Sequence, residues 1–497
     1  MSRPGPTDDV TAPGVGPVAA RVVRWAGFAG AVLLTVAGWS GGALPDVPAS
    51  RWDGVPVLAG WLVGTLLMTG AWWTLRRGAP STRWAYLTAG LWLLPLLVSA
   101  PLGSRDVYSY ACQGWVYADG GDPYATGVAE AGCPWTEAVS PLWRDTPAPY
   151  GPFFLLLAAL AATLGGGLTG TVLLLRLFAL VGVLLAALCL PGLARAAGVP
   201  TRRAAWLGLA SPLVGVHLVA GAHNDALLVG LLLLGLLVLV RSPGKPRPLL
   251  VAGALLGLAV AVKATALVVL PFAALAAVLG RYTVRALLRD AGWLAAGVLA
   301  ALAATSLLSG LGLGWVAALA RTGDSEQWTS PPTAVGFVLD YLLEFAGRRP
   351  GAVPVTRFVA VLLLAGFLAG LWWWSWRSVR RLGGARQRVH RLTAARVRVT
   401  LLGAGLALAA TVVLTPVFYP WYATWPLLVL AVVATRTTWF VLPCALASFL
   451  TLPDGTSLAR FAKAPGALAM TALVLVAALW AARRAGARKG PFLTPTV

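Results

Sequence analysis

The sequence predicts an all-α polytopic membrane protein, and three observations lead to that class. Hydrophobic residues make up 58% of the 497 residues and charged residues only 11%, against about 25% charged residues in a soluble domain. Apolar runs close to the ~20 residues that cross a bilayer recur along the chain. The net charge of +22 comes from short basic clusters between those runs, a pattern typical of cytoplasmic loops rather than of a nucleic-acid-binding surface.

The chain divides into a tail, a membrane domain and a second tail. Residues 1–20 are polar and rich in Pro and Gly, which predicts a disordered cytoplasmic segment and not a cleavable signal peptide. Residues 21–482 hold the apolar runs, and residues 483–497 form a basic cytoplasmic tail. We expect about 14 spans, near residues 22–44, 55–75, 84–102, 170–194, 204–220, 224–241, 248–262, 264–279, 290–310, 356–376, 399–417, 424–436, 438–450 and 467–482.

A short apolar run over residues 151–164 decides the topology. As a span it would move most of the later basic clusters to the outside, whereas as a helix in the membrane interface it leaves them inside. The tendency of basic residues to stay in the cytoplasm favours the interfacial helix. Both termini are then cytoplasmic, and the acidic residues gather in outer loops over about 103–169 and 311–355. We therefore expect function at the outer face.

The first outer loop opens with Asp106, directly after an apolar run. A carboxylate that is partly removed from water can act as a general base, since burial raises its pKa towards the working pH. Tyr108, Tyr110 and Trp115 follow and suit stacking on a sugar ring. The alternative is an Asp that caps the next helix, with the aromatic residues in an interfacial belt.

A second polar group lies in the turn over residues 221–225, between two long apolar runs. Ionisable residues near membrane depth indicate a functional site, so His223, Asn224 and Asp225 are candidate substrate-binding residues. The alternative is a polar turn in which Asn224 and Asp225 cap the following helix.

Lys263 interrupts another long apolar stretch. A lone Lys at the bilayer centre costs about 2.5–3.5 kcal/mol, so the side chain needs an anion or a route to water. A lipid phosphate is the expected anion, and a snorkelling side chain at a helix end is the alternative.

Aromatic and sulfur-containing residues complete the outer face. The turn over residues 418–422 carries Tyr419 and Trp421, which either cover the site or belong to an interfacial belt. Cys112 and Cys133 share the first outer loop, where they form a disulfide in an oxidising compartment or stay as two free thiols. The chain has no phosphate-cradling GxxxxGK[ST] motif, and three His residues do not support a His-rich zinc site.

Four motifs, over residues 104–110, 148–152, 221–225 and 261–265, together resemble one family. In this order they are similar to the actinobacterial polyprenol-phosphate-mannose-dependent α-1,6-mannosyltransferases, over roughly residues 25–480. That family belongs to the GT-C class of integral-membrane glycosyltransferases, so the resemblance implies a GT-C-type helix bundle. It also implies a catalytic Asp early in the first outer loop, at Asp106. The family's acidic residue after His-Asn can be Glu, whereas Asp225 here is one methylene shorter.

The resemblance implies an inverting transfer of mannose from polyprenyl-phosphate-mannose to an α-1,6-mannan of the lipomannan or lipoarabinomannan type. Asp106 would take the proton of the acceptor 6-hydroxyl on the outer face of the plasma membrane. Lys263 and Arg105 would bind the donor phosphate, and no cofactor or metal would be required because fixed cations neutralise the leaving group. The expected substrate-binding residues are Tyr108, Tyr110, Trp115, Tyr150, His223, Asn224, Asp225, Tyr419 and Trp421.

Two other functions fit a membrane protein of this composition. One is a transporter or flippase for a lipid-linked cell-envelope intermediate, and the other is a glycan-binding scaffold without catalysis. A transporter needs polar residues along a pathway at mid-membrane. This chain concentrates its polar residues in two outer loops, which favours the enzyme.

Overall fold

A computed structural model describes residues 16–46, 54–280, 282–319, 321, 325–383 and 389–487 of the protein. These residues are helical apart from loops and one isolated bridge between Thr451 and Ser457, which confirms the all-α class. Helix α1 begins at Pro17 and α18 ends at Ala487, so both extend into the segments expected to be tails. Pro favours the first turn of a helix, which accounts for the early start of α1. The remainder of both tails lies outside the described residues.

The first half of the chain places three helices before the first outer loop and a central bundle after it. The helices are α1 (Pro17–Gly41), α2 (Gly54–Thr74), α3 (Thr82–Leu97), α4 (Asp106–Ala118), α5 (Pro152–Leu164), α6 (Leu168–Ala197), α7 (Thr201–Leu209), α8 (Asp225–Arg241), α9 (Pro246–Val262) and α10 (Leu270–Ala277), with the short helical segments η1 (Thr136–Ala138), η2 (Pro141–Trp143), η3 (Val214–Ala220) and η4 (Ala264–Val269).

The second half contains two long helices, α14 and α15, that pack against each other, and it ends with three further helices. Its helices are α11 (Val284–Ser309), α12 (Gly314–Ala318), α13 (Pro331–Phe345), α14 (Ala352–Gly383), α15 (Val389–Leu414), α16 (Thr424–Ala431), α17 (Thr438–Ala447) and α18 (Lys463–Ala487), with the short segments η6 (Pro420–Ala423) and η7 (Leu458–Phe461).

Seven helices in the described residues are long and apolar enough to cross a membrane: Pro17–Gly41, Gly54–Thr74, Leu168–Ala197, Val284–Ser309, Ala352–Leu382, Thr393–Leu414 and Lys463–Arg483. Helices α7 and η3 form an eighth candidate that bends by 61°. Other expected spans are shorter helices, such as α16 with 8 residues and α17 with 10. At 1.5 Å per residue neither reaches across the ~30 Å hydrocarbon core. The count of 14 spans stays a prediction.

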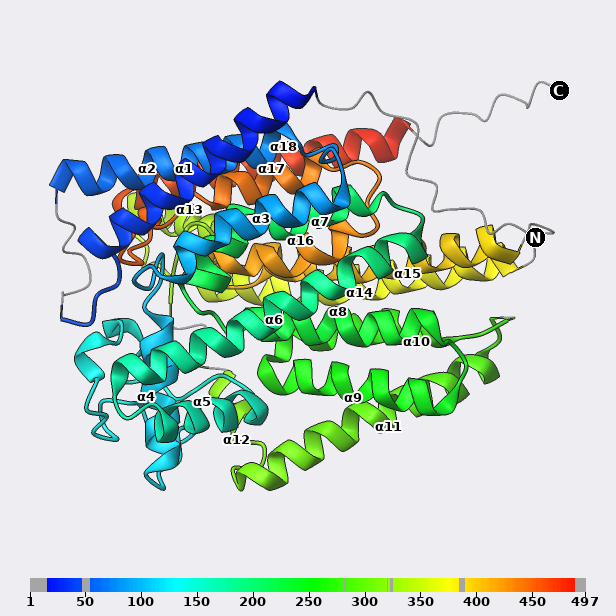
Figure 1. The fold of residues 1–497 in the computed structure, drawn as a ribbon, viewed down its shortest axis with the longest axis horizontal. Helices are drawn as coiled ribbons and strands as arrows, with labels where there is room; N and C mark the ends of the chain where they lie inside the picture. Colours follow the sequence, from blue (N-terminus) through cyan, green and yellow to red (C-terminus); the bar gives the residue numbers. More distant parts are fainter. Residues whose placement is uncertain are drawn as a thin grey trace.

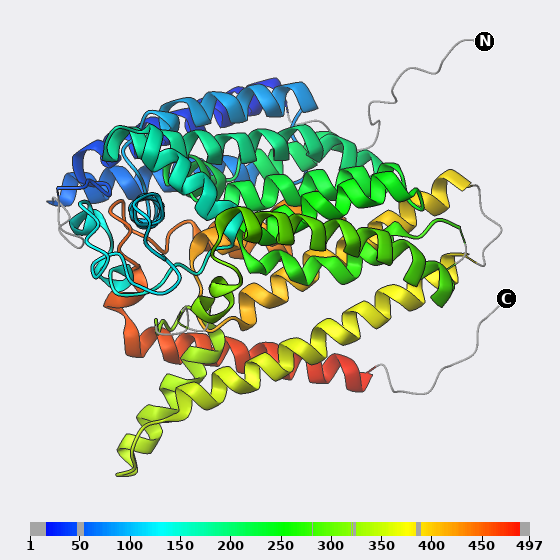
Figure 2. The ribbon, with the colours of Figure 1, turned by 90° about the horizontal axis from the view of Figure 1, so that it is seen from below.

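The segments expected to lie outside and inside gather at opposite ends of the bundle. Helices α4 and α5 and the loop between them lie at one end, whereas α14 ends and α15 begins at the other (Figures 1 and 2). The described basic residues at that second junction include Arg377, Arg380 and Arg381. The separation of acidic and basic ends agrees with the charge pattern, and the side of the membrane that each end faces stays a prediction.

Helix α5 is the short helix expected over residues 151–164. It packs against α4 on one side and against α6 on the other. Phe154, Leu155 and Ala158 are buried by this packing. The position of α5 in the membrane interface stays a prediction. Its packing against α4 also stabilises the helix that begins with Asp106.

Glycine lets α6 and α8 approach each other closely. A Cβ atom at Gly182 would lie 2.2 Å from the carbonyl oxygen of Ala226, and one at Gly230 would lie 2.4 Å from that of Gly182. Small residues serve this purpose in membrane helices, where close backbone approach replaces the hydrophobic effect as the source of packing energy. The contact fixes the first turns of α8, where Asp225 is located.

Arg176 of α6 connects two segments of the outer end. Its buried guanidinium donates hydrogen bonds to the carbonyl oxygens of Leu97 at 3.0 Å, Ser99 at 2.9 Å and Ala220 at 2.8 Å. Leu97 ends α3 just before the first outer loop, and Ala220 ends η3 just before the turn at 221–225. One cation therefore holds together the two stretches that carry the candidate site residues.

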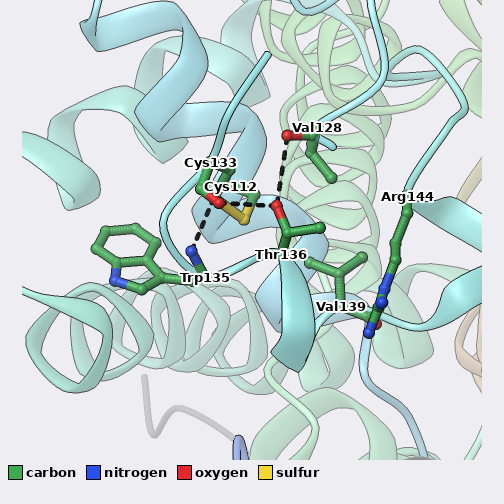
Figure 3. Close-up of a disulfide and its surroundings, with 7 residues drawn as sticks. All are labelled: Cys112, Val128, Cys133, Trp135, Thr136, Val139 and Arg144. Atoms are coloured by element: carbon green, nitrogen blue, oxygen red, sulfur yellow. Dashed lines mark hydrogen bonds between the residues drawn. A yellow bond between two sulfur atoms is a disulfide. The ribbon is translucent and has the colours of Figure 1, made fainter. Parts of the chain in front are cut away.

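A disulfide joins Cys112 of α4 to Cys133, with 5.6 Å between the two Cα atoms. The sequence left open whether these cysteines pair, and the structure pairs them. Next to the bridge, the Thr136 hydroxyl donates to the Cys133 carbonyl at 2.7 Å (Figure 3). The bond therefore fastens the middle of the first outer loop to the helix that begins with Asp106. Cys189 and Cys444 are free and buried.

We expect Cys112→Ser with Cys133→Ser to lower the free energy of unfolding by about 3 kcal/mol, because the bridge closes a loop with a sequence separation of 21. Thermal unfolding of the purified protein in detergent measures the loss, and the matched control is Cys189→Ser. An unchanged midpoint, or an alkylation mass that is the same with and without reductant, would contradict the bridge.

Candidate active site

Asp106 is the first residue of α4, and α4 lies at the end of the bundle opposite the α14–α15 junction (Figure 1). The backbone N–H of Asp106 donates to the Ser104 hydroxyl at 3.0 Å, which fixes the direction in which α4 begins. Its side chain is only 12% exposed. The carboxylate is thus held at the edge of a buried region and still reaches open space.

The loop after α17 lies directly against this turn. A Cβ atom at Gly455 would lie 2.7 Å from the Cα of Ser104, and the φ of Gly455 is +92°. Both the space and the backbone angle favour glycine at this position. The N–H of Gly103 also donates to the Pro453 carbonyl at 2.9 Å. Two segments far apart in the sequence therefore meet beside Asp106.

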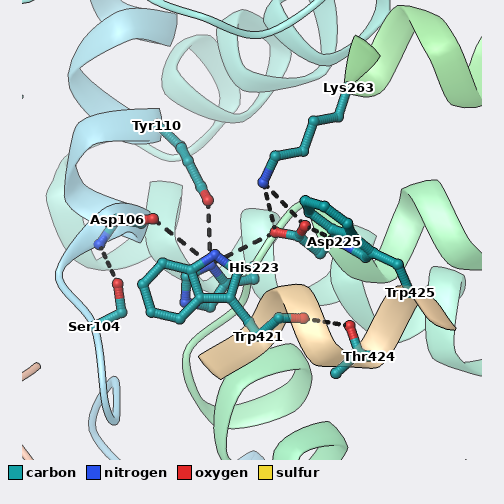
Figure 4. A network of polar contacts seen from close by, with 9 residues as sticks. All are labelled: Ser104, Asp106, Tyr110, His223, Asp225, Lys263, Trp421, Thr424 and Trp425. Atoms are coloured by element: carbon teal, nitrogen blue, oxygen red, sulfur yellow. Dashed lines mark hydrogen bonds and ion pairs between the residues drawn. The ribbon is translucent and has the colours of Figure 1, made fainter. Parts of the chain in front are cut away.

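His223 lies between two carboxylates. Its Nδ1 is 3.7 Å from an Asp106 oxygen and 3.8 Å from an Asp225 oxygen. The Tyr110 hydroxyl is 3.3 Å from the same nitrogen, and the ring stacks on Trp421 with 4.1 Å between centroids (Figure 4). Burial lowers the pKa of His223 well below its usual range, so the ring is neutral and acts as a polar spacer between the two acids.

The turn that carries His223 has an unusual backbone. Ala222 adopts a φ of +52°, a left-handed conformation that costs a non-glycine residue about 1–2 kcal/mol. Strain of this kind persists where the surrounding structure enforces it. Asn224 is buried next to it, and neither atom of its amide has a hydrogen-bond partner among the described residues.

Asp225 and Lys263 form a buried ion pair. The Lys263 Nζ donates to the two Asp225 carboxylate oxygens at 3.0 and 3.2 Å, and the Trp425 indole donates to one of them at 2.6 Å. Nζ also lies 4.7 Å from the ring centroid of Tyr422 and 5.1 Å from that of Trp425. One negative and one positive group therefore neutralise each other inside an aromatic enclosure.

A cavity of about 670 Å³ opens in front of Asp106. Five stretches of the chain line it: residues 104–106, 140–143, 325–328, Tyr419 with Trp421, and 454–463. Phe337 of α13 closes one side. The cavity is thus lined by the two loops that are expected to lie outside and by the turns over 418–422 and 454–463. Its size is that of a small-ligand site.

The electrostatics of the cavity favour a proton acceptor at Asp106. Burial raises the pKa of its carboxyl to about 6, while the Lys263 charge and hydrogen bonds from Ser104 and Trp143 oppose the rise. The neighbouring Asp225 charge adds to it. A carboxylate with a pKa near the working pH is ionised at neutral pH and still basic enough to accept a proton.

Four of the expected site residues line this cavity, namely Arg105, Asp106, Tyr419 and Trp421. Five others form the network behind it, namely Tyr110, Tyr150, His223, Asp225 and Lys263. Asn224 lies in the same turn as His223. The remaining two are placed elsewhere: Tyr108 donates to the Ala43 carbonyl, and Trp115 packs against the hydrophobic core. Both are absent from the cavity lining.

Sequence reasoning missed several residues of the cavity. Trp143 and the stretch over 454–463 were not singled out, although the latter is a polar segment between two expected spans and so belongs to the outer side. The location of this polar stretch between two expected spans could have marked it as a candidate part of the site. Arg176 was also missed, and a lone Arg in an apolar run indicates buried partners.

Metal binding was not expected. Among the described residues, no group of three or more His, Cys, Asp or Glu side chains is arranged to hold a metal ion. The expectation that the reaction needs neither a metal nor another cofactor stays a prediction.

Comparison with known proteins identifies the family. Residues 24–279 match the model of the alpha-(1->6)-mannopyranosyltransferase N-terminal domain, and residues 332–481 match the MptB C-terminal domain. The chain belongs to this mannosyltransferase family. The resemblance inferred from the four motifs is therefore confirmed, and the protein is a membrane glycosyltransferase by family.

Relatives from two groups of bacteria align with most of the chain. A probable alpha-(1->6)-mannopyranosyltransferase of Mycolicibacterium smegmatis is 34% identical over 84% of this chain and 79% of its own. Alpha-(1->6)-mannopyranosyltransferase A of Mycobacterium tuberculosis is 33% identical over 82% and 79%. Alpha-(1->6)-mannopyranosyltransferase B of Corynebacterium glutamicum is 28% identical over 96% and 85%.

Among solved structures, an oligosaccharyltransferase of Archaeoglobus fulgidus matches 75% of this chain and 52% of its own, with 15% identity and a TM-score of 0.36. A score this low does not establish a common fold.

The border between the two family regions runs through the cavity of this mannosyltransferase. Asp106 and Trp143 belong to the N-terminal region, whereas Phe337, Tyr419 and the stretch over 454–463 belong to the C-terminal region. Residues 325–328 lie between the two matched regions and also line the cavity. The site is therefore assembled from both.

We expect Lys263→Met to lower the free energy of unfolding by about 3–5 kcal/mol, because it leaves Asp225 buried without its counter-ion. Adding Asp225→Asn should restore most of this loss, since the amide can still accept from Trp425. Thermal unfolding of the wild-type protein and the two variants in detergent measures both effects. A double variant no more stable than Lys263→Met would show that the ion pair is not the cause.

Proposed function

We propose that the protein transfers mannose from polyprenyl-phosphate-mannose to the 6-hydroxyl of an α-1,6-mannan of the lipomannan or lipoarabinomannan type. The transfer takes place at the outer face of the plasma membrane and inverts the anomeric configuration of the donor. The proposal rests above all on one observation: a buried carboxylate with a raised pKa borders a ligand-sized cavity in a chain of the mannosyltransferase family.

In this mechanism Asp106 is the general base. Its carboxylate removes the proton of the acceptor 6-hydroxyl while that oxygen attacks the anomeric carbon of mannose. The bond from this carbon to the phosphate oxygen breaks, and the polyprenyl phosphate leaves with the bonding pair. An inverting displacement needs the base and the leaving group on opposite faces of the sugar, and the cavity provides room for both.

The network behind the cavity keeps Asp106 in its basic form. The Asp225 charge disfavours ionisation of Asp106, and the charge of Lys263, which pairs with Asp225 at 3.0 Å, opposes this effect. His223 fills the space between the two carboxylates and is fixed by stacking on Trp421. Asp106 can therefore be ionised at neutral pH and keep the raised pKa that burial gives it.

Aromatic side chains support the sugar. Tyr419 stacks on Trp421 with 4.7 Å between ring centroids, and Trp143 meets Tyr419 edge-on at 6.3 Å. All three line the cavity beside Asp106. Broad apolar faces with polar edges suit the hydrophobic face of a pyranose ring, so we assign these residues to the sugar-binding surface. Arg105 lines the same cavity and contributes positive charge to it.

The charge distribution supports the proposed side of the membrane. The cavity is lined by residues at the start of α4, and α4 lies at the end of the bundle opposite the α14–α15 junction, where Arg377, Arg380 and Arg381 are found (Figure 1). Basic residues favour the cytoplasmic side, which supports an outward-facing cavity. A lipid-linked donor also agrees with the described residues, which form no separate nucleotide-binding domain.

We expect Asp106→Asn to lower kcat by about 10²–10⁴-fold, because the amide keeps the shape of the carboxylate but not its basicity. The assay uses purified protein, radiolabelled polyprenyl-phosphate-mannose and a dimannoside, with linkage analysis of the product. Asp119→Asn is the matched control, since Asp119 is exposed at the far end of α4. Undiminished transfer by Asp106→Asn would remove it from the role of base.

The pH profile gives an independent test. Because Asp106 must be ionised to accept a proton, and its pKa is raised to about 6, activity should fall as the pH drops through 6. At higher pH it should level off. Measuring kcat/KM for the acceptor between pH 4.5 and 8 locates this limb, in buffers of constant ionic strength. A limb near pH 4, the range of an exposed Asp, would contradict a buried base.

A further inference from the structure

The cavity carries more positive charge than the reaction described so far uses. Its basic lining residues are Arg105, Arg460 and Lys463, and its acidic ones are Asp106, Glu326 and Asp454. Arg460 and Lys463 come from η7 and the start of α18, on the side that belongs to the C-terminal family region. The question is which of these charges are already compensated within the protein.

Arg105 is engaged on its own side of the cavity. Its guanidinium is buried and donates to the Ala138 carbonyl at 3.2 Å. The Asp454 charge acts on it favourably, and Asp454 in turn accepts from the amide and hydroxyl of Thr456 at 2.9 and 2.8 Å. This cation and this carboxylate therefore form part of the wall.

Arg460 and Lys463 are different, because neither forms an ion pair within the part of the chain that the structure describes. Both side chains belong to exposed residues. The Lys463 Nζ lies 4.5 Å from the ring centroid of Phe337, which also lines the cavity. Two cations that have no ion-pair partner among the described residues therefore border the same cavity as Asp106.

Lys263, the residue first expected to bind the donor phosphate, already has an anion. Both oxygens of Asp225 lie within 3.2 Å of its Nζ, and it is absent from the cavity lining. A phosphate at Lys263 would have to displace a carboxylate that is 0% exposed. Leaving such a group buried without a partner is costly, so the structure favours a phosphate site elsewhere.

The surroundings of Lys463 suit a lipid. It begins α18, whose apolar membrane-length stretch is only 11% buried within the protein. Leu468, Leu475 and Val476 along this helix are exposed, and so is Phe461 beside Arg460. An apolar tail can therefore lie along α18 while its charged head reaches the cavity, an arrangement that a water-soluble phosphate would not need.

We propose that Arg460 and Lys463 bind the phosphate of the lipid-linked donor, an assignment that rests on the proposed transfer from polyprenyl-phosphate-mannose. Fixed cations at this position stabilise the negative charge that develops as the phosphate leaves. The sugar then lies between the cations of the C-terminal region and the base of the N-terminal region. Attack and departure occur on opposite faces, as inversion requires.

The test replaces both cations at once, with Arg460→Gln and Lys463→Gln. We expect the KM for polyprenyl-phosphate-mannose to rise by about 10- to 100-fold, the range for losing charge-assisted hydrogen bonds to one anion. The KM for the dimannoside should stay the same. Retention of radiolabelled polyprenyl phosphate by the purified protein should weaken by a similar factor. Monodispersity in detergent ensures that folded protein is compared.

Two matched variants sharpen the result. Arg348→Gln with Arg349→Gln removes the same charge from exposed residues outside the cavity lining, and it should change neither quantity. Arg460→Lys with Lys463→Arg keeps the charge and should keep most of the binding. An unchanged donor KM in the Gln pair, an equal rise in the control pair, or a rise in the dimannoside KM instead would overturn the assignment.

The source of the phosphate is tested by competition. Inorganic phosphate at millimolar concentration should not displace labelled polyprenyl phosphate, because it lacks the tail that lies along α18. Equal displacement by the free ion would overturn a lipid-linked ligand. A wild-type protein that retains polyprenyl phosphate through these two cations but transfers no mannose would refute the proposed function and leave the phosphate site standing.

Discussion

A buried guanidinium joins the two stretches of chain that lead to the candidate site. Arg176 donates to carbonyl oxygens at the end of α3 and at the end of η3, so the loop that leads to Asp106 and the turn that leads to His223 share one anchor. A charge in an apolar helix is tolerated only where such acceptors surround it. This connection matters for the site, because Asp106 and Asp225 begin different helices and the two stretches that Arg176 joins lead to them.

The carboxylates of Asp225 and Asp106 have different surroundings and therefore different roles. Asp225 is neutralised by Lys263 inside an enclosure of Tyr and Trp rings, which makes it part of the framework. Asp106 has no Lys or Arg ion-pair partner among the described residues, and burial raises its pKa. His223 keeps the two acids apart without adding charge of its own. The same residue type is therefore a structural group at one position and a candidate proton acceptor at the other, and the difference is set by its neighbours.

Much of this could be predicted from local sequence. An Asp directly after an apolar run, a polar turn between two such runs and the distribution of arginines are properties of short segments, and the structure brings Asp106, His223 and Asp225 together as those segments suggested. Partners could not be predicted in the same way. Lys263 and Asp225 are 38 residues apart, and no periodicity indicates that they pair, so Lys263 looked available for a phosphate. Likewise Tyr108 and Trp115 have the composition of a sugar site, but helix geometry turns them towards Ala43 and the core. Short helices such as α16 also made the number of spans unpredictable from hydrophobicity alone.

The cavity is built by two regions of the chain that match separate family models, with Asp106 contributed by one and Phe337, Tyr419 and the 454–463 stretch by the other. Substitutions in either region alter the cavity residues of that region and leave those of the other region unchanged. Substitutions in one region can therefore change which molecule the cavity binds, while the catalytic residues of the other region stay the same. New substrate specificities can then arise through successive substitutions in one region. Because the bound sugar contacts both regions, selection acts on both of them together.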